Sequence, residues 1–201
     1  MREIDIRRTA VYGLVAVALV APACSNSTSV DTSSAPLTLV VTSESEAPEP
    51  PAEVTLVGER DAEVTLTGAI AAKYLAATDF QRTALGKVLT GDFNAGSRDG
   101  SLQFQQFQGG VITAKNDQAD APGYITWGRI REAWNVPRDP DGMPFVTGEN
   151  GSVGPLGAPT SDEYAEGGLL VQTFDHGRVV YHPETDQAEV TINGTVVPSG
   201  L

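Results

Sequence analysis

The sequence has little cysteine and histidine, and both shortages limit the chemistry that it can carry. Cys24 is the single cysteine, so no disulfide can form within the chain. His176 and His182 are the two histidines. A metal site or a triad could be imagined around them, but the H-E-x-x-H, C-x-x-C and G-x-S-x-G patterns are all missing. We therefore predict no catalytic residue, no metal site and no cofactor, and we expect both histidines on the surface of a hairpin.

Basic residues are also scarce. The chain has 13 Lys and Arg against 26 Asp and Glu, which gives a formal net charge of −13. Nucleic-acid binding needs a basic surface, so this composition argues against DNA and RNA as partners. Anionic polymers and anionic lipid headgroups are disfavoured for the same reason, whereas neutral surfaces stay open as ligands.

The sequence contains no apolar run of about 20 residues, the length that crosses a bilayer as a helix. Its apolar stretch near the start, "TAVYGLVAVALV" (residues 9–20), follows the charged head "MREIDIRR" and precedes the small residues of "APAC". This order is typical of a secretory signal peptide, which we predict over residues 1–23. The protein is therefore expected to be exported.

The lone cysteine follows this segment directly and can be interpreted in two ways. Ala21-Pro22-Ala23 fits ordinary signal cleavage, whereas Cys24 lies where a lipoprotein carries its acylated thiol. Because Cys24 has no disulfide partner and a polar tether follows it, we predict lipidation at Cys24. Stable anchoring then needs more than one acyl chain. We expect contact with the membrane through this anchor alone, at the outer face of the cytoplasmic membrane or in the cell envelope.

The next segment is rich in Ser, Thr, Glu, Pro and Ala. Its composition cannot bury enough apolar area to offset chain entropy, so we predict a disordered tether over residues 24–60 and a folded region over residues 61–201.

A short strand-like pattern occurs three times in the chain. "AEVTLVG" (residues 52–58), "AEVTLTG" (62–68) and "AEVTING" (188–194) each alternate apolar and polar residues and end in Gly. This period of two predicts half-buried strands. Near-identity at three places calls for a search for longer repeats.

A longer unit occurs twice. "TGAIAAKY" (residues 67–74) matches "WGRIREAW" (127–134), with an Ile and an aromatic residue four apart, on one face of a helix. "LGKVLTGD" (85–92) then matches "LGAPTSD" (156–162), where Gly and Pro suit a tight turn and Thr160 or Ser161 resembles a helix cap followed by acids.

A hairpin and a closing strand complete the unit, since "QQFQGGVI" (residues 105–112) matches "QTFDHGRV" (172–179). We predict an α+β fold of two tandem repeats, at about 61–126 and 127–197, each with a helix, a Gly-rich turn and a β-hairpin. The residues that we expect to build the repeats are Gly68, Ile70, Leu85, Gly86, Phe107, Gly128, Ile130, Trp134, Leu156, Gly157, Pro159, Phe174, Gly177 and Gly194.

These motifs resemble the LGFP repeat family, named for a Leu-Gly-aromatic-Pro motif, over about residues 61–197. The second copy fits better, although Ala158 replaces the motif aromatic. The first copy reads "LGKV" and lacks both the aromatic residue and the proline. The resemblance implies a non-catalytic envelope lipoprotein, since such repeats are appended to mycolyltransferases and wall hydrolases and hold them to the arabinogalactan–peptidoglycan layer.

Two other classes of function stay open. An accessory esterase or wall hydrolase would need a catalytic domain, and the residues before Asp61 are few and polar. A structural subunit of an envelope complex is the other alternative. The expected partners are a neutral cell-wall polysaccharide or envelope proteins.

The aromatic residues are the candidates for ligand contact. Those at equivalent positions of the two units (Tyr74, Phe107, Trp134 and Phe174) are expected in the core, because each unit of a repeat protein buries its apolar face on the next. Trp127 and Tyr181 lie near strand edges, and we predict that these two stack on sugar rings.

Overall fold

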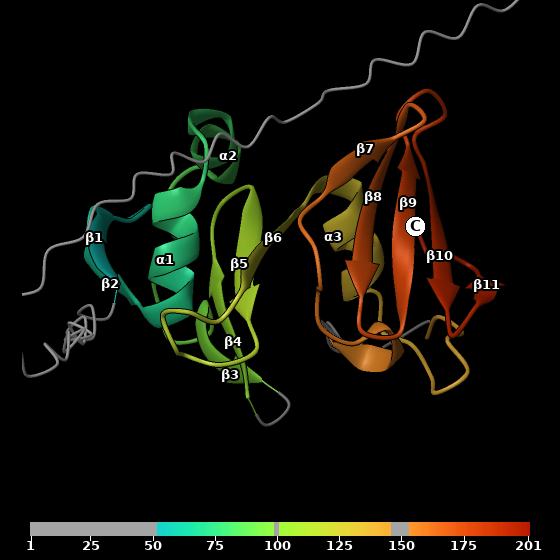
Figure 1. The fold of residues 1–201 in the computed structure, drawn as a ribbon, viewed down its shortest axis with the longest axis horizontal. Helices are drawn as coiled ribbons and strands as arrows, with labels where there is room; N and C mark the ends of the chain where they lie inside the picture. Colours follow the sequence, from blue (N-terminus) through green and yellow to red (C-terminus); the bar gives the residue numbers. More distant parts are fainter. Residues whose placement is uncertain (1–51, 99–100, 146–152) are drawn as a thin grey trace, which may run out of the picture. The chain divides into compact units, whose positions relative to one another are not determined.

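The computed structural model describes residues 52–98, 101–145 and 153–201, all within one compact unit from Ala47 to Leu201. The predicted signal peptide and Cys24 lie outside the described residues. The described ranges form three α-helices, one 3-10 helix and three antiparallel sheets, which confirms the α+β class (Figure 1). The described helices lack the length and apolar character that a bilayer crossing requires.

The fold begins earlier than the sequence predicts. β1 (Glu53–Val57) pairs antiparallel with β2 (Glu63–Thr67), so that Val54 lies opposite Leu66. The side chains of β2 alternate between exposed and at least partly buried, as the period of two predicts. The prediction of a disordered tether over residues 24–60 is therefore wrong for β1, which pairs with β2, a strand of nearly the same sequence.

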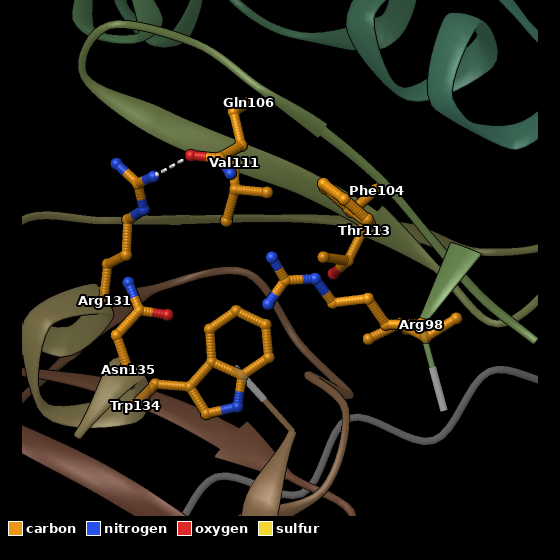
Figure 2. Close-up of a pocket in the computed structure, with 9 residues that line it drawn as sticks. Arg98, Phe104, Gln106, Val111, Thr113, Arg131, Trp134 and Asn135 are labelled. Carbon is orange, nitrogen blue, oxygen red and sulfur yellow. Dashed lines mark hydrogen bonds between the residues drawn. The ribbon is translucent and has the colours of Figure 1, made fainter. Parts of the chain in front are cut away.

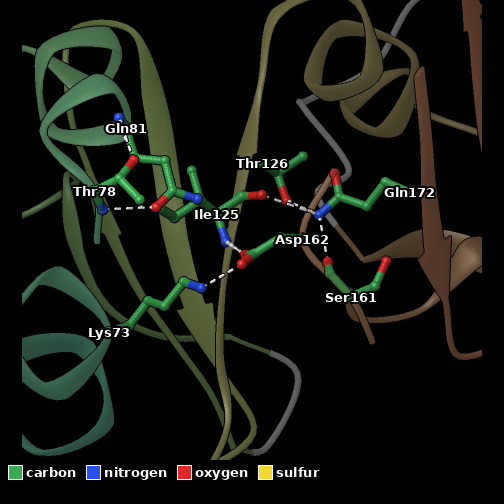
Figure 3. Close-up of polar contacts among 8 residues, drawn as sticks. All are labelled: Lys73, Thr78, Gln81, Ile125, Thr126, Ser161, Asp162 and Gln172. Carbon is green, nitrogen blue, oxygen red and sulfur yellow. Dashed lines mark hydrogen bonds and ion pairs between the residues drawn. The ribbon is translucent and has the colours of Figure 1, made fainter. Parts of the chain in front are cut away.

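Two helices follow β2. α1 (Gly68–Ala76) starts directly after the strand, and α2 (Asp79–Leu85) starts with a capping box in which Thr78 and Gln81 bond each other's backbone N–H (Figure 3). Gly68 has φ of 56°, and a Cβ there would lie 2.0 Å from the carbonyl oxygen of Asp117. Only glycine fits this junction.

The chain then forms a four-stranded sheet in the order β3-β4-β5-β6. Its strands are β3 (Ala95–Arg98), β4 (Leu102–Gln106), β5 (Gly110–Ala114) and β6 (Gly123–Trp127). β5 is buried along its whole length, with α1 and α2 both in contact with it.

The last part of the described chain forms α3 (Gly128–Asn135), the 3-10 helix η1 (Gly154–Leu156) and a five-stranded sheet in the order β11-β10-β9-β8-β7. The strands are β7 (Tyr164–Glu166), β8 (Leu169–Phe174), β9 (Gly177–His182), β10 (Gln187–Ile192) and β11 (Thr195–Val197). No helix begins at Thr160 or Ser161, contrary to the predicted cap. The hydroxyl of Ser161 instead accepts the backbone N–H of Thr173.

Two apolar cores hold these elements. The first core is built by β2, α1, α2 and the β5–β6 part of the four-stranded sheet, and the second by α3 and the five-stranded sheet. Leu102 and Val111, from the four-stranded sheet, belong to the second core. The four-stranded sheet therefore packs into both cores.

Polar contacts also join the two sheets (Figure 3). The fully buried amide of Gln172, on β8, donates to the carbonyl oxygens of Ile125 and Ser161 at 3.1 and 2.9 Å and to the Thr126 hydroxyl at 3.0 Å. The Asp162 carboxylate accepts a hydrogen bond from the backbone N–H of Ile125 at 2.8 Å and forms an ion pair with Lys73. β6 is thus tied to the segment before β7 by side chains rather than by a strand ladder.

We expect the Gln172→Met variant to lose about 2–3 kcal/mol of unfolding free energy, because two buried acceptors and one partly buried acceptor lose their donor while the volume is kept. Urea unfolding followed by circular dichroism measures the loss. Gln187→Met, at an exposed strand position, is the matched control and should change stability by less than about 0.5 kcal/mol. Equal effects of the two variants would contradict the bridging role of Gln172.

Candidate functional site

The two Leu-Gly turns have the same local structure. Leu85 and Leu156 are both fully buried, and Gly86 and Gly157 follow them with φ of 69° and 79°. Both glycines adopt backbone angles that side chains disfavour, which explains why Gly stands at each turn. The Leu-Gly motif therefore has a structural role at both places.

The hairpin that follows each Leu-Gly turn in the chain contacts that turn in the same way. The backbone N–H groups of Lys87 and Ala158 are each bound by a hairpin side chain, Gln108 Oε1 at 3.1 Å and Asp175 Oδ2 at 3.0 Å. Isolated bridges also join Val88 to Phe107 and Pro159 to Phe174. The aromatic residue of each hairpin is thereby fixed against its turn.

The predicted core aromatics are in the core. Phe107, Trp134 and Phe174 are at most 4% exposed, and Tyr74 is partly buried and stacks on Phe107 at 5.7 Å between ring centroids. Trp134 lies 5.8 Å from Phe174, and its indole N–H donates to the Gly157 carbonyl at 3.0 Å. Ile70 and Ile130 are also buried.

The histidines lie on or next to β9. His176 is exposed in the turn before β9, and His182 ends that strand and is partly buried. Across the described ranges, no group of three His, Cys, Asp or Glu residues has an arrangement that could hold a metal ion.

Trp127 ends β6 and lies beside an exposed aromatic ring. Its indole is partly buried, and Phe80, 75% exposed at the start of α2, meets it edge-on at 6.3 Å between ring centroids. The carboxylate of Glu163 is the polar neighbour of the Trp127 side chain. Burial raises the pKa of Glu163, and its interaction with Trp127 partly opposes that rise. We call Phe80, Trp127 and Glu163 the aromatic surface.

Tyr181 lies in a different environment. Its ring packs on the second core from β9, and its hydroxyl donates to Asp186 at 3.1 Å. Asp186 also forms an ion pair with Arg129, which lowers the pKa of Asp186, while the nearby Asp186 carboxylate raises the pKa of Tyr181. The Tyr181 hydroxyl is thus already occupied by a neighbour within the fold.

The described structure does not bring Trp127 and Tyr181 together, since Trp127 packs against the first core and Tyr181 against the second. The sequence patterns did not predict a role for Phe80. Its position in the sequence could have indicated exposure. Phe80 is an apolar residue in the first turn of a short capped helix, and Leu85, at the other end of that helix, is the residue that faces the core.

A comparison with known protein families identifies the second Leu-Gly turn and its hairpin as part of one family model. The LGFP repeat model matches residues 156–195, from the Leu156-Gly157 turn through β10 to the start of β11. No curated protein matches the chain. An LGFP repeat is consistent with a protein associated with the cell envelope. Residues 156–195 of this chain are therefore an LGFP repeat.

Proposed function

We propose that the protein is a non-catalytic cell-envelope lipoprotein that contacts the wall polysaccharide through two LGFP-type repeats. The observation that carries the proposal is the LGFP match at residues 156–195, together with the exposed aromatic surface of the same folded unit. The proposal has three further parts, which are a first repeat, a neutral glycan as the ligand and a lipid anchor in the membrane.

The first repeat is supported by geometry that the family model does not cover. Gly68 and Gly128 start α1 and α3 with φ of 56° and 54°. The backbone N–H of Gly109 donates to Leu85 at 2.8 Å, as that of His176 donates to Leu156 at 3.0 Å. Such agreement, without the motif aromatic and proline, favours a degenerate copy of the same repeat over residues 61–126.

A neutral glycan suits the aromatic surface. An apolar ring offers a flat surface to the C–H face of a sugar, and the Glu163 carboxylate accepts hydrogen bonds from hydroxyl groups. The net charge of −13 cannot attract an anionic polymer. Binding should therefore depend little on salt. Arabinogalactan is the first candidate, from the family resemblance.

We expect Phe80→Ala to weaken retention on purified cell walls by about fivefold or more, since removal of a central aromatic contact often costs more than about 1 kcal/mol. Phe80 is 75% exposed, so the fold should survive. Co-sedimentation with walls measures retention. Phe93→Ala is the matched control, because Phe93 is 90% exposed and lies outside the aromatic surface.

The same assay tests the ligand when the walls are stripped of arabinan by mild acid. Retention should fall on stripped walls, and equal retention would contradict arabinogalactan as the ligand. Equal retention of Phe80→Ala and the unaltered protein would contradict the aromatic surface. Cleavage of a wall ester or glycan by the pure protein, abolished by a point substitution in it, would contradict the non-catalytic role.

The lipid anchor is tested at Cys24, outside the described residues. Cys24→Ser is expected to move the protein from the membrane fraction to the soluble or secreted fraction, because the thiol that would carry the acyl chain is removed. Fractionation and the mass of the mature protein measure this. An unaltered protein that is already soluble, with an unmodified Cys24 at its start, would support ordinary signal cleavage instead.

A further inference from the structure

A cavity of about 80 Å³ lies between the four-stranded sheet and α3. Figure 2 shows side chains entering it from both sides, with Arg98, Phe104 and Thr113 from the sheet and Arg131, Trp134 and Asn135 from α3. None of the described residues that line it is acidic. In a chain with a net charge of −13, this cavity is a local concentration of positive charge.

Arg131 is the first unusual group in this cavity. Its guanidinium is partly buried and donates to the amide oxygen of Gln106 at 2.9 Å, and burial lowers its pKa. Within the described ranges no carboxylate forms an ion pair with Arg131. The guanidinium stays protonated at neutral pH. This partly buried charge therefore has one neutral acceptor, Gln106, and further N–H donors that a ligand can use.

Thr113 is the second unusual group. Its side chain is 1% exposed, and its hydroxyl has no hydrogen-bond partner among the described residues. A buried hydroxyl without a partner destabilises a fold, and Val would fill the same shape on a strand without that penalty. Two donors that the fold leaves unused thus face one cavity from β5 and α3.

We propose that this cavity binds a small oxyanion, the carboxylate or phosphate group of a ligand. The Arg131 guanidinium and the Thr113 hydroxyl donate to its oxygens, and Trp134 and Phe104 form apolar walls. Arg98, whose guanidinium lies 4.9 Å from the centre of the Phe104 ring, places a second positive group at the cavity. The site is separate from the aromatic surface and does not depend on the proposed wall binding.

The test is a titration of the full chain with sodium acetate and, separately, sodium phosphate, each at constant ionic strength in chloride. The readouts are the ¹H–¹⁵N signals of the Arg131 Nε and Trp134 Nε1 groups. We expect saturable shifts of both signals. A response to acetate alone identifies a carboxylate ligand, a response to phosphate alone identifies a phosphate ligand, and a response to neither overturns the proposal.

Three variants locate the bound anion. Arg131→Gln should weaken binding by about tenfold or more, read at Trp134, since a hydrogen bond to a charged group is lost. Thr113→Val should weaken binding several-fold with an unchanged or higher melting temperature, a combination that a purely structural hydroxyl would not give. Arg178→Gln removes the same charge at an exposed position on β9 and should leave binding unchanged. An equal loss in Arg178→Gln, or full affinity in either of the other two variants, would overturn the site.

Discussion

Trp134→Ala is expected to lower the free energy of unfolding by about 4–5 kcal/mol, enough to unfold a marginally stable protein at growth temperature. Trp134 is 2% exposed and contacts Phe174 in the second core. The substitution leaves a large cavity, and it also removes the N–H that satisfies the carbonyl of Gly157. Chemical denaturation followed by circular dichroism measures the loss.

Trp134→Phe separates the two contributions. It keeps a ring against Phe174 but cannot donate to Gly157, so we expect a smaller loss of about 1–2 kcal/mol. A loss in Trp134→Ala that is no larger than that in Trp134→Phe would contradict the role of ring packing, and would mean that the hydrogen bond dominates.

Gly177→Ala has the second largest expected effect, a loss of about 3 kcal/mol or more. A Cβ at Gly177 would lie 1.8 Å from the carbonyl oxygen of Thr191, in the neighbouring strand β10. Backbone cannot rotate out of the way as a flexible side chain can, so the β9–β10 ladder has to shift. Thermal unfolding and the β-sheet signal in circular dichroism measure the effect.

Gly194→Ala is the control for the Gly177 prediction. Nothing lies within 4 Å of a Cβ at Gly194, but its φ is 82°. The expected loss is about 1 kcal/mol, from backbone strain alone. If Gly177→Ala is tolerated as well as Gly194→Ala, the close approach of the two strands is not a constraint on the fold.

Features with a local cause could be predicted from the sequence. The strand pattern of "AEVTLTG", the Leu-Gly turns and the core positions of Phe107, Trp134 and Phe174 all follow from periodicity and from the backbone freedom of Gly. The LGFP repeat at residues 156–195 was identifiable because it keeps most of the motif. The α+β class followed from these elements.

Features that depend on distant partners could not be predicted. The strand pattern of β1 was recognised, but β1 was still placed within the tether, because its pairing with β2 cannot be derived from the pattern alone. The contacts of Gln172 and Asp162 with β6 span 46 and 37 positions in the chain, and nothing local marks either residue as a bridge. Phe80 and the cavity at Arg131 likewise arise only when separate elements meet.

The Asn193-Gly194 turn ends β10 in a different way from the ends of β2 and β6. After β2 and after β6, a glycine leads the chain into a helix. After β10, Asn193 and Gly194 have φ of 49° and 82°, the angles of a two-residue type I′ hairpin, and the chain returns as β11 along the free edge of β10. A glycine with positive φ at the end of a strand thus has two opposite outcomes in one protein. At Gly68 and Gly128 the chain leaves the sheet as a helix, whereas at Gly194 it returns to the same sheet, and the choice between them lies in the residues that flank the glycine.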